Sequence, residues 1–182
     1  GQERILGSSV RLRGTGLAGR VAATYLAAGG VGELVLDGLG AAIEAIGGQV
    51  EYAPDGAYTE RPDVAIVVYG EDPYAEYQGD RETLEFEPGQ KRALPLLKSF
   101  ESARIPVVSL FISGRPMWTN PEINASGAFV AVWLPGSEGV GVADVLVADG
   151  EGNPRHDFRG RLSFSWPDTP LQGRLNPHHE AY

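Results

Sequence analysis

The sequence predicts an α/β fold with a single doubly wound, mostly parallel sheet that has helices on both faces. Three apolar runs carry this prediction, at residues 64–69, 107–112 and 128–134. None of them alternates between apolar and polar residues, so each is expected to be a strand buried on both faces, as in a parallel sheet. Helical segments separate the runs, and repeated strand–helix–strand units build a doubly wound sheet. With 182 residues the chain is long enough for one domain, and we assign residues 1–182 to it.

The first 38 residues are predicted to form a strand, a helix and a second strand. Residues 10–13 are a short strand candidate. Residues 17–28 are predicted to be helical, because apolar side chains recur there at helical spacing and alanine fills most of the other positions. The stretch Glu33-Leu-Val-Leu-Asp37 is the predicted second strand.

The remaining elements follow from similar patterns. An Ala-rich helix at residues 39–46 ends at two glycines, and residues 50–53 form a strand that stops at a Pro-Asp-Gly turn. Residues 161–166 alternate between apolar and polar, which suits an antiparallel edge strand, and residues 167–182 are expected to form an irregular tail. Helices are predicted at residues 94–104, 121–125 and 140–148. The resulting architecture is of the Rossmann-like or flavodoxin-like type.

Composition excludes several classes of function. The chain has 15 Lys and Arg against 24 Asp and Glu, a net charge of −9, which argues against nucleic acid or an anionic membrane as a partner. It has no cysteine, so disulfides, thiolate catalysis and Cys-based metal sites are excluded. The three histidines, His156, His178 and His179, show no metal-binding spacing. We expect a soluble chain with no metal and no cofactor; no signal peptide is visible, and the composition does not fix the compartment.

A glycine-rich stretch near the N-terminus has the spacing of a dinucleotide-binding loop. Gly14, Gly16 and Gly19 follow the first predicted strand and open a predicted helix, and Asp37 ends the next predicted strand. In that context the glycines let the diphosphate approach a helix N-terminus, and the acid binds the ribose. The alternative is that the glycines only allow close packing of the helix on the strand. That alternative is favoured because two arginines interrupt the first strand, which is normally apolar throughout.

A second candidate site lies where the buried strands end. Glu71 and Asp72 follow the first apolar run, Arg115 follows the second, and Glu138 follows the third. The carboxyl ends of parallel strands meet at one edge of a sheet, so these side chains are expected to converge there. Carboxylates with an arginine, and with two tryptophans nearby in sequence, would suit a neutral polyol better than a phosphate. The alternative is that these loops merely cap the strands.

Four ordered motifs in residues 39–182 give this part of the chain a resemblance to a known family. They are Asp63-Val-Ala-Ile-Val-Val-Tyr-Gly-Glu-Asp-Pro-Tyr-Ala-Glu76 with Gly79-Asp80, Ser113-Gly-Arg-Pro116, Ala131-Val-Trp-Leu-Pro-Gly-Ser-Glu-Gly139 and Gly160-Arg-Leu-Ser-Phe-Ser-Trp-Pro167. The region is similar to the C-terminal α/β domain of family 3 glycoside hydrolases, the β-glucosidase and exo-β-glucanase group. The resemblance implies that Glu138 is the general acid/base residue. It also implies that the nucleophilic Asp lies in a preceding (β/α)8 barrel and that a Trp-bearing, sugar-holding loop of the domain is missing here.

Residues 2–38 instead resemble the start of the adenylating enzymes that activate ubiquitin-like sulfur carriers. The similar stretches are Gln2-Glu-Arg-Ile-Leu6, Gly14-Thr-Gly-Leu-Ala-Gly19 and Tyr25-Leu-Ala-Ala-Gly-Gly-Val-Gly32, with Asp37. This resemblance implies an ATP-binding loop, and the glycine spacing would also suit NAD. The family's downstream Arg, Lys and Asp partners and its metal-binding cysteines have no counterpart here. A chimera, engineered or recombinant, with its join near residue 38 would explain both resemblances.

Three hypotheses about function therefore remain. The favoured one is a chimeric scaffold without a complete active site, which retains Glu138 but cannot hydrolyse glycosides alone. The second is an accessory hydrolase domain that acts with a separate barrel, and the third is a nucleotide-binding module. The surface that faced a barrel in the relatives is expected to expose apolar side chains and to support a homodimer. A weak sugar or nucleotide ligand is the expected small-molecule partner.

Overall fold

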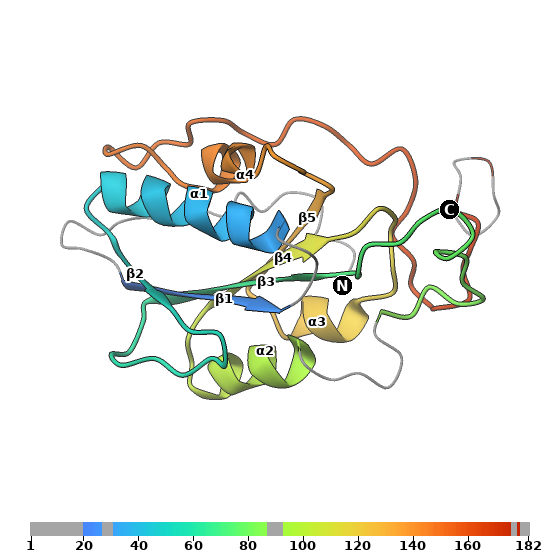
Figure 1. Cartoon of the computed structure of the whole chain (residues 1–182), viewed down its shortest axis with the longest axis horizontal. Helices are drawn as coiled ribbons and strands as arrows, with labels where there is room; N and C mark the ends of the chain where they lie inside the picture. The colour runs from blue at the N-terminus through green and yellow to red at the C-terminus, as the bar shows by residue number, and fades with distance from the viewer. Residues whose placement is uncertain (1–19, 27–30, 87–92, 176–177, 179–182) are drawn as a thin grey trace.

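A computed structural model describes residues 20–26, 31–86, 93–175 and 178 of the 182-residue chain. Within them, five strands form one sheet in the order β2-β1-β3-β4-β5, and every neighbouring pair is parallel (Figure 1). This order is that of flavodoxin-like sheets, in which ligands bind beyond the carboxyl ends of the strands. The strands are β1 (Arg20–Leu26), β2 (Gln49–Tyr52), β3 (Val64–Gly70), β4 (Val107–Ile112) and β5 (Ala128–Trp133).

Helices cover both faces of the sheet, which confirms the predicted doubly wound fold. Figure 1 shows α1 (Val31–Ala45) and α4 (Val140–Leu146) on one face and α2 (Ala93–Ser102) and α3 (Asn120–Asn124) on the other. The predicted boundaries of β3, β4, β5 and the last three helices agree with the structure to within two residues. Among the described residues, no helix is long and apolar enough to cross a membrane.

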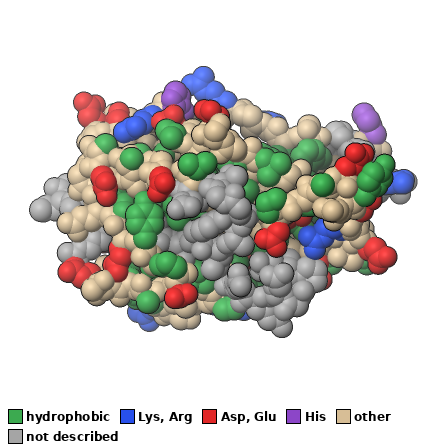
Figure 2. Space-filling model, in the orientation of Figure 1, with side chains coloured by type: hydrophobic (Ala, Val, Ile, Leu, Met, Phe, Trp, Pro, Cys, Tyr) green, Lys and Arg blue, Asp and Glu red, His purple; other side chains and the backbone are tan. Residues whose placement is uncertain are grey.

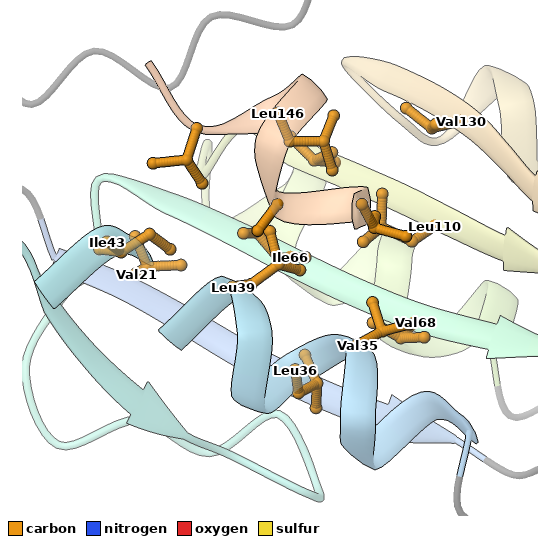
Figure 3. Close-up of a cluster of buried hydrophobic side chains, with 14 of the residues drawn as sticks. Val21, Val35, Leu36, Leu39, Ile43, Ile66, Val68, Leu110, Val130 and Leu146 are labelled. Atoms are coloured by element: carbon orange, nitrogen blue, oxygen red, sulfur yellow. The ribbon is translucent and has the colours of Figure 1, made fainter. Parts of the chain in front are cut away.

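The sheet separates two apolar cores. Ile66 and Val68 of β3 point to the α1–α4 side, where they meet Leu39 and Leu110 (Figure 3). Val67 and Tyr69 of the same strand belong to the opposite core, with Phe111. All six residues of β4 are buried, as are the last six of β3, so the central strands are covered on both faces as predicted.

The predictions for residues 17–37 are wrong. The Ala-rich stretch predicted to be helical contains β1, which pairs with β2 on one side and β3 on the other. Pairing on both sides therefore outweighs the helical preference of alanine. The predicted strand at residues 33–37 lies inside α1, where Val35, Leu39 and Ile43 are buried at helical spacing.

Two glycines inside α1 explain why the sequence predicted a separate strand and helix here, where the structure has one continuous helix. A Cβ on Gly38 would lie 3.0 Å from the Cα of Val140, and one on Gly40 would lie 2.6 Å from the Tyr52 hydroxyl oxygen. These glycines let α4 and β2 approach the helix closely, so they do not end it. The sequence pattern alone reads glycine as a helix terminator, whereas here it is a packing residue.

The predicted antiparallel edge strand at residues 161–166 is not a strand in the described structure. Its apolar residues instead pack on the α2–α3 face of the sheet: Trp166 is buried, and Phe164 makes an edge-on contact with Trp133 of β5 at 6.0 Å between ring centroids. The alternation reflected side chains that pack on the sheet while the backbone does not pair with it. Every strand pair in the described residues is parallel.

Candidate functional site

Three loops leave the carboxyl edge of the sheet side by side. Residues 71–80 follow β3, residues 113–116 follow β4 and residues 134–139 follow β5, and these three strands are neighbours in the sheet. The first two loops approach especially closely, since a Cβ on Gly70 would overlap the carbonyl oxygen of Ile112. The backbone N–H of Glu71 donates to that same oxygen at 3.0 Å. A parallel sheet therefore places the predicted site residues along one edge.

Glu71 is the centre of a polar network at this edge. Its side chain is only 7% exposed, and the Ser113 hydroxyl donates to its Oε2 at 2.5 Å. Arg115 Nε lies 3.1 Å from Oε1, and Arg81 Nη1 lies 3.4 Å from the same oxygen. The predicted convergence of Glu71 and Arg115 is thus present, but the two residues bind each other. Two guanidinium groups compensate the buried carboxylate, so its main contribution is to join the loops.

Arg115 also holds a tyrosine of the first loop. Its guanidinium lies over the ring of Tyr74, 4.5 Å from the centroid, which is a cation–π contact. The Nη2 atom of the same guanidinium is buried without a hydrogen-bond acceptor. A Cβ on Gly79 would overlap the Tyr74 ring, and one on Gly114 would lie 3.1 Å from its hydroxyl oxygen. Both glycines therefore provide room for the ring.

Glu138 lies in the loop after β5 and is exposed. Its backbone N–H donates to Pro135 O at 2.9 Å, and the Ser137 hydroxyl donates to its Oε1 at 3.3 Å. The next residue, Gly139, touches the first turns of α1, because a Cβ there would lie 2.9 Å from the carbonyl carbon of Leu34. Glu138 therefore lies just before α4, where this loop packs against the first turns of α1.

Three further residues of this edge were missed as site residues. Arg81 completes the ion pair with Glu71 from ten positions further along the chain, a separation that no short motif marks. Tyr74 and Ser113 were visible in the motifs but had no predicted role.

Asp72 is exposed, as expected for a binding residue, and so is Glu76 in the same loop. Trp133, the last residue of β5, packs edge-on against Phe164, and the backbone of Trp118 forms an isolated bridge with Glu85.

The predicted nucleotide site loses its structural context. Gly14, Gly16 and Gly19 lie outside the described residues, but the residue after Gly19 begins β1 and not a helix. A diphosphate bound by this loop would need a helix N-terminus at that point. Asp37 is exposed in the middle of α1 and does not end a strand. In the described residues no group of three or more His, Cys, Asp or Glu is arranged to hold a metal ion.

Large apolar side chains are exposed around the same edge. Tyr74, Tyr77 and Leu134 belong to the loops after β3 and β5, with exposed fractions of 45%, 81% and 69%. Leu34 in the first turns of α1 and Val140 at the start of α4 are also exposed.

Figure 2 shows acidic side chains spread over the visible face of the molecule and not gathered in one patch. A cavity of about 580 Å³, lined by residues that include Val21, Gln49 and Thr59, opens at the opposite edge, where the strands begin.

Comparisons with known proteins agree on one family. The family described as "Glycosyl hydrolase family 3 C-terminal domain" matches residues 9–181, a range that crosses the join predicted near residue 38. The exo-1,3/1,4-beta-glucanase from a Pseudoalteromonas species is 42% identical, with a TM-score of 0.85 over 91% of this chain and 24% of that one. The "Lysosomal beta glucosidase" of Dictyostelium discoideum is 37% identical over 109 residues, 59% of this chain and 12% of the relative. A β-glucosidase from Listeria innocua, in complex with isofagomine, shares the fold at 24% identity, with a TM-score of 0.62 over 89% of this chain and 25% of that one. The chain thus spans about a quarter or less of the length of these relatives.

Proposed function

This chain belongs to the glycosyl hydrolase family 3 C-terminal domain family, and we propose that it acts as an accessory domain of a β-glucoside-cleaving enzyme. The observation that carries the proposal is its 42% identity, over 91% of its length, to part of an exo-1,3/1,4-beta-glucanase. Neither the family match nor the fold supports a chimera, since the match begins at residue 9 and β1 and α1 continue the same sheet and helix layers.

The carboxyl edge is the surface proposed to face the rest of the enzyme. Five exposed apolar side chains lie on its loops and on the helix ends beside them, and such side chains mark interaction surfaces. Exposed carboxylates stand among them, and glycoside cleavage needs a pair of carboxyl groups. The resemblance assigns the nucleophile to a (β/α)8 barrel, so this edge would supply the acid/base partner. We therefore propose that the isolated chain has no complete active site.

Two carboxylates of the edge compete for the acid/base role. Glu138 is the residue that the resemblance implies. Its exposed side chain accepts a hydrogen bond from the hydroxyl of the neighbouring Ser137 at 3.3 Å. Glu76 is exposed on the loop that Glu71, Tyr74 and Arg115 hold in place, and a fixed loop positions a catalytic group. These positions support Glu76 as the stronger candidate.

Hydrolysis of an aryl β-glucoside tests the proposal in two settings. The 182-residue chain alone is expected to give no turnover above buffer. Turnover should appear when the chain is mixed with, or joined to, the barrel portion of the Pseudoalteromonas exo-glucanase, which alone lacks this domain. Turnover by the isolated chain that disappears in Glu138→Gln or Glu76→Gln would contradict the requirement for a barrel. A barrel that binds the chain and gains no activity would contradict the accessory role.

A further inference from the structure

Tyr77 combines a disfavoured backbone conformation with an exposed ring. Its φ is +67°, in the left-handed region that residues with a side chain rarely adopt, and 81% of its surface is exposed. Such a conformation is energetically unfavourable for a residue with a side chain, and it persists only where the surrounding structure enforces it. Strain of this kind gathers at binding and catalytic sites, and an exposed aromatic ring gains little from folding. Strain and exposure therefore coincide at Tyr77, as they do at residues that bind ligands.

The loop around Tyr77 enforces this conformation from both sides. Gly79 N–H donates to Ala75 O at 3.2 Å and Asp80 N–H donates to Tyr77 O at 3.2 Å, which closes two successive turns around the residue. The ring of Tyr74 is fixed against Gly79 and beneath the Arg115 guanidinium. These contacts hold the loop that carries the Tyr77 ring. A binding loop that is held in place in advance lowers the entropy cost of binding.

The side chains beside the ring define the class of ligand. Asp72, Glu76 and Asp80 are exposed in the same loop, and together they would repel a phosphate or another anion. Carboxylates accept hydrogen bonds from hydroxyl groups, and an aromatic face is a flat apolar surface on which the C–H face of a pyranose ring can rest. A neutral sugar satisfies both conditions.

We propose that Tyr77 is a sugar-stacking residue that binds a β-linked glucosyl unit at the carboxyl edge, next to Glu76. This inference rests on the proposed function and names a binding residue for it. The ring contributes stacking on the sugar, and its hydroxyl is not required. The strain at φ +67° is the cost of holding the ring in this position.

Titration of the 182-residue chain with laminaritriose, followed by amide and aromatic NMR, tests the proposal directly. Saturable shifts are expected at residues 74–80, and maltotriose, which is α-linked, should give weaker ones. Tyr77→Ala should weaken the affinity about tenfold, which corresponds to about 1.4 kcal/mol, and Tyr77→Phe should retain it. Tyr52→Ala removes another exposed tyrosine, at the β2 edge of the sheet, and should leave the affinity for laminaritriose unchanged. Equal affinity in Tyr77→Ala, or shifts elsewhere only, would overturn the inference.

A glycine at the same position separates binding from structure. Glycine adopts positive φ without strain, so Tyr77→Gly is expected to unfold at no lower temperature than the parent while losing the same affinity as Tyr77→Ala. A residue that served only the stability of the loop would show the opposite pattern, with a lower melting temperature and unchanged sugar shifts.

The outcome is independent of the accessory role. If the chain activates the barrel and Tyr77→Ala leaves both the sugar shifts and KM unchanged, this inference fails and the proposed function stands. If laminaritriose shifts the NMR signals of Tyr77 but the chain activates no barrel, the proposed function fails and this inference stands. If Tyr77→Ala weakens only the association with the barrel, the ring contacts protein and the sugar assignment is wrong.

Discussion

The loops after β3 and β5 each present an exposed carboxylate, but they are held by different forces. Residues 71–80 are anchored by side chains: Glu71 binds Arg115 and Arg81, and Tyr74 lies beneath Arg115. Residues 134–139 are anchored by backbone contacts, since Gly139 touches the backbone at Leu34 and Val35. The first loop therefore depends on charge and ring stacking, and the second depends on the absence of a Cβ. The comparison indicates that side-chain contacts hold the loop that carries Glu76, whereas close backbone packing holds the loop that carries Glu138.

Removing the carboxylate of Glu71 should have the largest effect on stability. Glu71→Ala leaves two guanidinium groups without their counter-ion at a nearly buried position, and breaking such a network costs about 3 kcal/mol of the free energy of unfolding. Urea unfolding followed by fluorescence would measure the loss. The neighbouring exposed Asp72→Ala should change the free energy by less than about 0.5 kcal/mol. Equal effects at the two positions would show that the network does not anchor the loop.

A methyl group at Gly139 tests the second loop in the same way. The new Cβ would meet the Leu34 carbonyl carbon at 2.9 Å and the Val35 nitrogen at 3.0 Å, both backbone atoms that cannot move aside. Gly139→Ala should therefore lower the free energy of unfolding by about 2 kcal/mol. Gly141→Ala is the matched control: it lies two residues away inside α4 with open space around it, and it should raise stability by about 0.5–1 kcal/mol. If both variants behave alike, close packing on α1 is not what holds this loop.

The arginine over Tyr74 separates stacking from charge. Arg115→Lys retains the positive charge beside Glu71 but loses the planar group over the ring, so about 1 kcal/mol of stability should be lost. Hydrogen exchange of the amides at residues 74–80 should increase, while exchange at residues 134–139 should not change. Faster exchange in both loops would mean that they are coupled and that the comparison between them fails.

A titration outside both loops gives the smallest effect and a baseline. Burial first, and then the charges of Asp37 and Glu44, raise the pKa of the Tyr52 hydroxyl above its usual value of 10.0. The folded state thus holds this proton more tightly than the unfolded state, so the stability it contributes is complete below about pH 10 and is lost as the pH rises through the raised pKa. Tyr52→Phe should make stability less sensitive to pH in this alkaline range, without affecting either loop. Urea unfolding at several alkaline pH values would measure this effect. The same pH dependence of the free energy of unfolding in Tyr52→Phe and in the parent would contradict this assignment.

The sequence predicted the central sheet well because its signal is local. Uninterrupted apolar runs such as Val107–Ile112 are buried on both faces, and few other structures tolerate them. It misassigned residues 20–26 and 31–37 because the contacts that decide their structure are distant in sequence. Ala22 and Ala23 pair with both β2 and β3, and Gly38 faces Val140, about a hundred positions away.

The candidate site was predicted in part for the same reason. Strand ends of a parallel sheet place Glu71 and Arg115 at one edge, which follows from topology. That the two would neutralise each other, with Arg81 as a third member, depends on side-chain geometry that no motif contains. The dinucleotide interpretation failed because it required a helix directly after Gly19, where β1 begins.

The most direct test of the account is the rate of aryl β-glucoside hydrolysis by the part of the exo-1,3/1,4-beta-glucanase outside the matched domain, complemented with variants of this chain. Glu76→Gln is expected to lower turnover about 100-fold or more, as the loss of a general acid does, while Glu101→Gln, an exposed carboxylate of α2, leaves it unchanged. A comparable loss in Glu138→Gln alone would move the acid/base residue to the loop after β5. Full turnover in both Glu76→Gln and Glu138→Gln would contradict the claim that this edge supplies a catalytic carboxylate.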